Sequence, residues 1–450
     1  MSDEQMDMMR MRLERNLWTC FANIVLGVWL ASAPWTFGYT DPLLPWSDLI
    51  SGTLIVLFAV LSLSYDRPWS RWAICVIGIW LLFAPLVFWA PESAAYVNDT
   101  LVGALAIAFS ILVPGMPGMR MQPGPDTPPG WSYNPSSWVQ RAPVITLGLI
   151  SFFIARYLAA WQLGYIDHAW DPIFGNGTVR ILDSDVSHAW PVSDAGFGAL
   201  SYMLESLSGF MGRENRWRTM PWMVLMFGIL VIPLGITSII LVILQPVMVG
   251  TWCTLCLMTA LFMLLMIPLA VDEVVAMGQF MATVRKQGKP FWLTFFKGGS
   301  PWEYPEERKD EGMDANPEKT NFHSSLPEIA VTSVRGVTVP LSLLASAVIG
   351  FWLMGAPPAL GAEGWAANSD FLVGPLIAVV AVSSWAEVIR PFRYVNVVLG
   401  GWLLIAPWLL DSATIASTIN DMLLGAVLIA LSLPLGPVTE RYGGWNARIR

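Results

Sequence analysis

The sequence predicts an all-α polytopic membrane protein, and three observations support this prediction. Of the 450 residues, 55% are hydrophobic and only 13% are charged. The mean hydropathy is +0.56, which lies outside the range typical of soluble globular domains. Apolar runs close to the roughly 20 residues that cross a bilayer recur along the whole chain. We therefore expect contact with membrane lipid and no nucleic-acid partner.

We expect about twelve transmembrane helices, with both chain termini in the cytoplasm. With this orientation almost every Lys and Arg falls on the cytoplasmic side, as the positive-inside rule requires, and Arg180 is the exception. The loops on the opposite side are acidic or uncharged, for example "FGYTDPLLPWSD". The expected helices lie at approximately 17–35, 48–64, 72–89, 98–113, 143–164, 191–212, 219–244, 249–270, 336–355, 370–388, 395–410 and 421–436.

A repeated motif occurs near both ends of the chain. The pattern G-x-W-L-x-x-A-P starts at Gly27, Gly78, Gly350 and Gly400, and a D-x-x-x-G pattern follows each copy. Each copy predicts a helical hairpin whose first helix ends near Ala-Pro and whose Asp caps the returning helix. The glycines permit close helix approach, and the tryptophans anchor the membrane interface. The residues with these structural roles are Trp29, Pro34, Asp48, Trp80, Pro85, Asp99, Trp352, Pro357, Asp370, Trp402, Pro407 and Asp421.

These copies resemble SPW repeats, a bacterial membrane module named for its Ser-Pro-Trp signature. Here the signature is relaxed to Ala-Pro-Trp at residues 33–35 and 406–408. The resemblance covers about 17–113 and 336–436. It implies a location in the bacterial inner membrane, and it implies no established chemistry.

Two polar segments divide the chain into units. Residues 114–142 are rich in Pro and Gly, and residues 285–335 contain the charged stretch "EYPEERKDEGMDANPEKTNFHSS", so both are expected to be cytoplasmic linkers. They separate a first repeat pair (1–113), a central four-helix unit (143–284) and a second repeat pair (336–450). The eighth helix is expected to continue out of the membrane through "VDEVVAMGQFMATVRKQ".

The central unit carries Cys253 and Cys256 at the start of its last helix, within "GTWCTLC". The predicted topology places them on the outer, oxidising side, where a helix N-terminus favours a thiolate. The C-x-x-C spacing alone leaves two interpretations open: a thiol-exchange pair, or two small apolar residues in a helix. A metal site would need further ligands, and only His168 and His188 are available on that side, so we expect no metal.

The central unit resembles the vitamin K epoxide reductase family. The similarity lies in "TWCTLCLMTALFML", in the basic turn "RENRWR" and in "DSDVSHAWPVSDAGFGALSY", and it covers about 143–272. It implies a four-helix bundle with a quinone pocket beside the C-x-x-C motif. It further implies that Cys256 faces the quinone and that Cys253 exchanges with an outer thiol.

The loop between the first two helices of this unit departs from the family pattern. Family members usually carry a second cysteine pair there, which passes electrons to the C-x-x-C motif. Here the loop reads "GYIDHAWDPIFGNGTVRILDSDVSHAW" and contains no cysteine. Either a separate thioredoxin-like thiol protein exchanges directly with Cys253, or the bundle is retained without turnover.

Three further residues are candidates for binding the quinone: Arg156, Glu205 and Trp252. A buried arginine in a membrane is costly and usually has a partner or a function. Arg156 and Glu205 are expected about 10 Å apart in depth, at 1.5 Å rise per residue. A structural ion pair, a polar role in the quinone site and snorkelling all stay open for them. Asp194 is expected to cap the sixth helix.

These observations lead to two functional hypotheses. The first is a membrane thiol–disulfide oxidoreductase that passes electrons from periplasmic thiols, through a redox-active disulfide of Cys253 and Cys256, to a membrane quinone. The second is a non-catalytic scaffold or accessory subunit of a larger membrane complex. The intact C-x-x-C motif favours the first hypothesis, whereas the missing loop cysteines favour the second.

Overall fold

The computed structural model describes residues 3–64, 67–112, 124–299 and 324–449. These residues fold mainly into helices, with two isolated β-bridges and no strand among them. Eleven of the helices are long and apolar enough to cross a membrane. The all-α membrane fold predicted from the composition is therefore confirmed.

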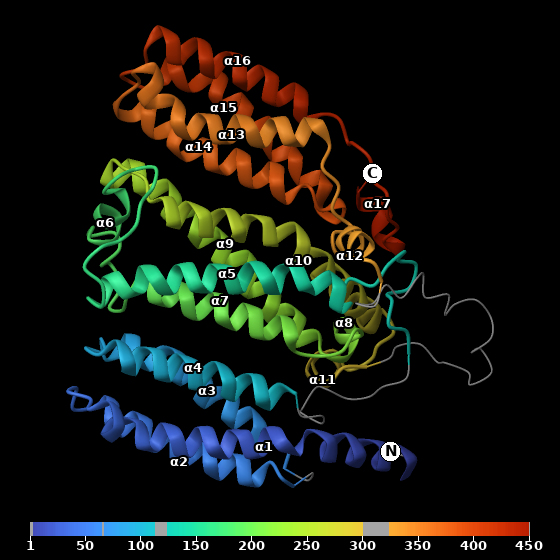
Figure 1. Cartoon of the computed structure of the whole chain (residues 1–450). Helices are drawn as coiled ribbons and strands as arrows, with labels where there is room; N and C mark the ends of the chain where they lie inside the picture. The colour runs from blue at the N-terminus through green and yellow to red at the C-terminus, as the bar shows by residue number, and fades with distance from the viewer. Residues whose placement is uncertain (1–2, 65–66, 113–123, 300–323, 450) are drawn as a thin grey trace.

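The long helices form three layers that follow one another in chain order (Figure 1). The N-terminal layer contains α1 (Asp3–Phe37), α2 (Leu44–Leu61), α3 (Trp69–Val87) and α4 (Ser93–Ile111). The central layer contains α5 (Trp138–Gln162), α7 (Asp194–Phe210), α9 (Pro221–Leu244) and α10 (Thr254–Lys286). The C-terminal layer contains α13 (Leu341–Leu360), α14 (Gly364–Ser383), α15 (Val395–Leu409) and α16 (Ile415–Ser432).

Short helices lie at the two ends of the layers (Figure 1). One end carries α6 (Gly177–Leu182), and we call it the α6 end. The other end, which we call the terminal end, lies near both chain termini. Its short helices are α8 (Arg216–Thr219), α11 (Phe291–Lys297), α12 (Leu326–Ser333), the 3₁₀ turns Glu387–Tyr394 and Gly443–Trp445, and α17 (Asn446–Ile449).

The sixth predicted span corresponds to α7, which is 17 residues long and is the one predicted span missing from the eleven candidates. It was expected to begin near residue 191 but begins at Asp194, because Ser193 caps it. The Ser193 hydroxyl accepts a hydrogen bond of 2.9 Å from the Gly196 N–H. The expectation that Asp194 is the cap is therefore wrong. Since α7 packs against α5 and α9, the central unit is nevertheless a four-helix bundle.

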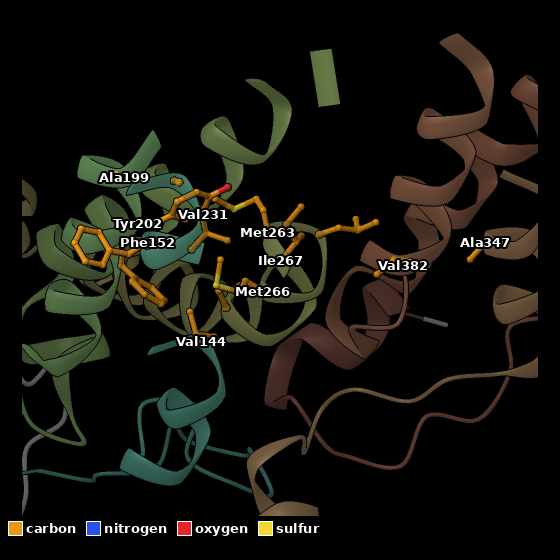
Figure 2. Packing of buried hydrophobic residues seen from close by; sticks show 14 of the residues in the cluster. Val144, Phe152, Ala199, Tyr202, Val231, Met263, Met266, Ile267, Ala347 and Val382 are labelled. Carbon is orange, nitrogen blue, oxygen red and sulfur yellow. The ribbon is translucent and has the colours of Figure 1, made fainter. Parts of the chain in front are cut away.

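The two outer layers pack on opposite sides of the bundle (Figure 1). The N-terminal layer contacts α7 through α3 and α4, and the rings of Trp72 on α3 and Trp222 on α9 lie 5.1 Å apart. The C-terminal layer contacts α9 and α10 through α14. Figure 2 shows Met263 and Ile267 of α10 between the interior of the bundle and Val382 of α14. The hydrophobic core of the bundle therefore continues into the C-terminal layer.

The repeat glycines make reciprocal contacts within each helical hairpin. A methyl group added to Gly27 would lie 2.7 Å from the carbonyl oxygen of Gly52, and one added to Gly52 would lie 2.5 Å from that of Gly27. Because Cβ atoms do not approach backbone so closely, only glycine lets these helices pack backbone against backbone. The predicted role of the glycines is confirmed. The same crossing joins three further pairs: Gly78 with Gly103, Gly350 with Gly374, and Gly400 with Gly425.

The repeat tryptophans join the two hairpins of each layer. Trp29 of α1 donates a hydrogen bond of 2.8 Å to Asn98 of α4, and Trp80 of α3 donates one of 3.0 Å to Ser47 of α2. Each acceptor directly precedes the motif aspartate of the other repeat. The sequence predicted interfacial anchoring for the tryptophans, and the structure adds a bond between repeats. The matching bonds of the C-terminal layer are Trp352 to Asn420, at 3.0 Å, and Trp402 to Ser369, at 2.9 Å.

The prediction that the repeat aspartates cap the returning helices is wrong. Each aspartate lies more than one turn inside its helix. Asp41 holds the start of α2 instead, because its carboxylate accepts hydrogen bonds of 2.8 and 2.7 Å from two backbone N–H groups there. The motif aspartates meet in the interior of their layers, Asp48 with Asp99 and Asp370 with Asp421.

The prediction that the first helix of each repeat ends near Ala-Pro is confirmed, since each ends two or three residues after the proline, but the proline itself does not end the helix. Helix α1 continues beyond Pro34 to Phe37, and α3 continues beyond Pro85 to Val87. A proline removes only its own N–H donor, and its carbonyl oxygen still accepts bonds from later residues. The Pro34 carbonyl, for example, accepts from the Gly38 N–H at 3.0 Å. Pro357 of α13 and Pro407 of α15 likewise lie inside their helices.

The described part of the first predicted linker is packed rather than loose. Helix α5 begins at Trp138, and Trp131 and Tyr133 are buried ahead of it. The ring of Trp131 lies 4.9 Å from that of Tyr442, which ties this segment to the C-terminal tail. Helix α10 continues to Lys286, as predicted. Nearly all of the charged stretch of the second predicted linker lies outside the described residues.

The glycine crossings lead to a prediction with an adjacent control. Gly400→Ala would place a methyl group 2.9 Å from the Gly425 carbonyl and 2.8 Å from Ile429, whereas Gly401 has no atom within 4 Å of such a methyl. We expect Gly400→Ala to lower the free energy of unfolding by about 1–3 kcal/mol. Gly401→Ala should be neutral or stabilising. Thermal unfolding in detergent measures both variants, and equal melting temperatures would contradict the proposed contact.

Candidate functional site

Cys253 and Cys256 form a disulfide at the start of α10. Their Cα atoms lie 5.3 Å apart, and Cys253 is the N-cap residue of the helix. The Cys253 sulfur accepts a hydrogen bond of 3.1 Å from the Cys256 N–H. A sulfur at this position faces the positive end of the helix dipole, which stabilises a thiolate after reduction. The structure therefore gives the pair the helix-terminal position that the sequence predicted.

A sharp connection between α9 and α10 holds Cys253 in place. Helix α9 ends in a π-helical turn, Gln245–Val249, and Gly250 then adopts a left-handed backbone with φ of 72°. The Gln245 side chain turns back, and its amide oxygen accepts a hydrogen bond of 2.9 Å from the Cys253 N–H. Gln245 is itself buried. The backbone of Cys253 is thus fixed by a side chain from the preceding helix.

The loop between α5 and α7 covers Cys253 and is fastened by Asp171. The Asp171 carboxylate accepts hydrogen bonds from the N–H and hydroxyl of Thr178, at 2.9 and 2.8 Å, and a short one from the Thr254 hydroxyl. The Thr178 hydroxyl also lies 3.5 Å from the Cys253 sulfur. We call Asp171, Thr178 and Thr254 the latch. Because of this cover, Cys253 has 0% exposed surface.

The approach of the loop to the disulfide depends on Gly177. A methyl group on Gly177 would lie 2.0 Å from the carbonyl oxygen of Trp252, so no other residue fits without a shift of the backbone. Arg180 of α6 donates a hydrogen bond of 3.1 Å to the Val249 carbonyl, which holds the far side of the short helix. The start of α6 therefore lies directly on the chain that leads into Cys253.

The environment of Asp171 keeps its carboxyl ionised. Burial alone would raise its pKa, but hydrogen bonds from Thr254, Phe174 and Thr178 outweigh that effect and hold the pKa well below its usual range. The resulting negative charge stabilises the N-terminus of α10.

Cys256 faces a cavity of about 260 Å³ inside the bundle. The cavity is lined by α5, α7, α9, α10 and the loop that carries α6. Its lining is largely apolar and includes a group of polar side chains, which is typical of small-molecule sites. The polar residues of the lining are Ser184, Ser187, Asp194, Ser201, Tyr202, Thr237, Ser238, Gln245 and Thr259.

Asp194, which lines this cavity, belongs to a group of hydrogen-bonded side chains. Its carboxylate accepts bonds from Ser187, at 2.8 Å, and from the side-chain amide of Gln162, at 2.5 Å. Gln162 in turn accepts from Ser193, the cap of α7. These contacts join the end of α5, the loop and the start of α7. The group therefore fixes the loop and the start of α7 relative to the end of α5 on this side of the cavity.

The structure does not place the three other candidate residues in the cavity. Trp252 points toward the C-terminal layer, with its ring 6.0 Å from that of Phe371 on α14. Arg156 lies on the side of α5 near Tyr96 of α4. Glu205 is fully buried, and neither of its carboxyl oxygens has a hydrogen-bond partner among the described residues. The ion pair considered for Arg156 and Glu205 is therefore absent from the described structure.

The described residues contain no group of three or more His, Cys, Asp or Glu side chains that could hold a metal ion. His168 and His188 are exposed in the loop. Sequence reasoning missed the latch and Gln245. The available signal for the latch was the Asp-Pro turn in "HAWDP", followed seven residues after the aspartate by a threonine.

Comparison with known proteins supports both resemblances. Residues 142–271 match the model described as vitamin K epoxide reductase family, and residues 17–113 and 342–434 match the SPW repeat domain. The first match spans α5 to α10 and includes the disulfide and its cavity. No curated protein and no solved structure matches the chain.

The latch leads to a prediction about access to the disulfide. Asp171→Asn replaces an accepting oxygen with an N–H₂ group that cannot accept from Thr178 or Thr254. Losing these charge-assisted bonds should raise the rate at which a soluble dithiol reduces the Cys253–Cys256 bond by about tenfold. The rate is measured by thiol labelling and mass spectrometry. Asp167→Asn, an exposed aspartate of the same loop, is the control, and equal rates for the two variants would refute the latch.

The lowered pKa of Asp171 also predicts a pH dependence. A carboxyl whose pKa is depressed on folding contributes stability above its unfolded pKa of about 3.9 and loses it as the pH falls further toward the folded pKa. The melting-temperature difference between the wild type and Asp171→Asn should therefore be constant from pH 8 to about 5. It should shrink below about pH 4. A difference that instead grew on acidification would contradict the ionised latch.

Proposed function

We propose that this chain, which contains a vitamin K epoxide reductase family domain between two SPW repeat domains, is a membrane thiol–disulfide oxidoreductase that passes electrons from thiols to a membrane quinone. One observation carries the proposal. Cys256 lines a mostly apolar cavity of about 260 Å³, while the sulfur bonded to it lies beneath a loop at the α6 end. The two sulfurs of one bond thus face two different environments.

The cavity suits a quinone as the electron acceptor. Apolar side chains of α7, α9 and α10 would contact the ring, and polar groups would orient its carbonyl oxygens. Gln245 is the best placed of these groups, because its amide oxygen accepts from the Cys253 N–H and leaves its N–H₂ group to donate. We assign Gln245 the role of orienting the quinone beside Cys256.

The proposed reaction has two balanced halves. In the first, two substrate thiols reduce the Cys253–Cys256 bond and leave as one disulfide, and the protein gains two thiols. In the second, the sulfur–sulfur bond reforms, and the two electrons and two protons released reduce one quinone to its quinol. The helix N-terminus assists both halves, because it stabilises the thiolate that attacks or leaves.

The thiol donor in this proposal is a separate protein. The loop between α5 and α7 contains no cysteine that could relay electrons to Cys253. Cys253 has no exposed surface while the latch is closed, so a thiol protein reaches it only when the loop moves. A thioredoxin-like partner that displaces the latch would then exchange directly with Cys253.

We also propose that the protein lies in the bacterial inner membrane with both termini in the cytoplasm. Lys and Arg residues gather at the terminal end, among them Arg216, Arg218, Arg285 and Lys286, which the positive-inside rule associates with the cytoplasm. The α6 end and the disulfide then face the oxidising periplasm, where thiol exchange of this kind operates.

A direct test follows the disulfide through one turnover. After reduction and removal of the reductant, we expect a soluble short-chain benzoquinone or naphthoquinone to restore the bond and to yield one quinol per disulfide. Thiol labelling and quinone absorbance measure the two products. Cys253→Ser and Cys256→Ser should each abolish the reaction, since neither can form the bond. Cys20→Ser, which removes a free buried cysteine of α1, should retain it.

The same experiment separates the enzyme from a scaffold or accessory subunit. The missing loop cysteines and the full burial of Cys253 favour the scaffold. If the reduced thiols stay free in the presence of either quinone, the redox proposal fails and the scaffold is the better description.

A further inference from the structure

A second cavity lies between the central bundle and the C-terminal SPW repeat domain. Its volume is about 390 Å³, and it is lined by α9 and α10 on one side and by α13 and α14 on the other. Hydrocarbon side chains form nearly all of its surface, and Ser238 adds a hydroxyl group. The C-terminal domain contributes Phe351, Met354 and Val379 to this wall. A repeat domain with no assigned chemistry therefore helps to build an apolar site.

The second cavity adjoins the cavity beside Cys256. Ser238, Val242 and Met263 line both of them, so these three residues of α9 and α10 lie between the two cavities, and we call them the partition. Gly235 lies next to this partition, and an added methyl group would lie 3.2 Å from Ile267 and 3.6 Å from Met263, so both side chains pack against the glycine. Methionine is unbranched and flexible, so its side chain can move aside at little cost. In Figure 2 Met263 lies on the route from the bundle interior toward α14.

The second cavity is also accessible from the membrane. Leu261 is 41% exposed and Phe351 is 46% exposed, and both belong to its lining. These residues come from α10 and α13, on the two sides of the boundary between the domains. Apolar lining residues therefore extend from the cavity beside Cys256, past Met263 and through the second cavity, to exposed residues at the boundary between the domains.

We infer that the second cavity binds the hydrocarbon tail of the quinone whose ring is reduced beside Cys256. This inference rests on the proposed function. The first cavity offers polar groups near the redox-active sulfur, and the second offers a hydrocarbon surface, which together match a molecule with a polar ring and a long apolar tail. A chain in the second cavity gains van der Waals contacts with its lining. The C-terminal SPW domain thus forms one wall of the quinone site.

An acyl chain of a phospholipid has the same hydrocarbon chemistry as a quinone tail. The two sources differ in what they do at the first cavity. A quinone tail follows the partition at Met263 and carries its ring to Cys256, whereas a phospholipid keeps its headgroup at the membrane surface. The test therefore compares quinones with and without a tail and also identifies the molecules that copurify.

The experiment uses substitutions in the C-terminal SPW domain whose larger side chains occupy part of the second cavity. Val379→Phe and Met354→Phe add bulk to its wall without touching Cys256. Val348→Phe is the matched control, because Val348 is 58% exposed on α13 and is not part of the lining. Each full-length variant is purified in detergent. Its KM is measured for a quinone with a long polyprenyl tail and for a tailless analogue, and its bound lipids are extracted and identified by mass spectrometry.

We expect both cavity variants to raise the KM for the tailed quinone by about fivefold or more, because the added ring excludes the tail. The KM for the tailless quinone should change less than twofold, and copurified polyprenyl quinone should fall relative to Val348→Phe. Equal effects on both quinones, no effect on either, or loss of phospholipid alone would overturn the inference. If the wild type reduces neither quinone, the proposed function itself has failed, which is a different result.

Discussion

A buried ion pair between Arg216 and Glu273 fixes α10, and the redox site depends on that helix. The guanidinium makes two bonds of 2.6 Å to the carboxylate, and it also donates to the carbonyl groups of Ser208 and Met211 at 2.8 Å. Ser136 donates to the same carboxylate from the segment before α5. Removing one partner of such a pair costs about 3–5 kcal/mol, because the other charge stays buried. Cys253 lies 20 residues from Glu273 along the chain, or about 30 Å at 1.5 Å per residue. Because both residues belong to the same helix, the ion pair at the terminal end sets the rotation of α10 about its axis and so the direction in which the disulfide faces at the α6 end.

The two repeat domains support this bundle through backbone packing rather than through chemistry. Lipid gives helices no hydrophobic reason to associate, so close van der Waals contact and polar bonds between helices have to supply the energy. The glycine crossings supply the first, and the bonds from Trp29 and Trp80 to the opposite repeat supply the second. These contacts join the four helices of each repeat pair into one packed layer. In the C-terminal layer, α14 packs against α9 and α10, so this layer contacts the helix that Cys253 caps.

Sequence patterns predicted the features that depend on composition and on spacing along the chain. They failed for features that depend on the rotation of a helix about its axis or on contacts between distant segments. The cysteine pair, the repeats and the long α10 follow from spacing along the chain. The depth of Arg156 and Glu205 could be estimated from the rise per residue, but the helix faces that carry them could not. Arg156 lies near Tyr96, whereas the Glu205 carboxyl has no hydrogen-bond partner among the described residues. Asp48 resembles a cap in the sequence, yet Asp41 already satisfies the start of α2, which moves the helix boundary earlier. The burial of Cys253 depends on a loop fold that no periodicity encodes.

The loop over the disulfide lacks the cysteine pair that family members usually carry, and this difference affects the proposed mechanism. A cysteine pair in the loop would carry electrons across the cover while it stays closed. This chain has the Asp171 carboxylate there instead. Its hydrogen bonds from the hydroxyl groups of Thr178 and Thr254 keep the loop over Cys253 until a binding partner breaks them. In the proposed reaction, opening the loop is therefore a required step of thiol exchange, whereas Cys256 already lines the cavity while the loop is closed. The two halves of the proposed reaction are then controlled separately, and a thiol partner governs the first half because its binding has to release the latch.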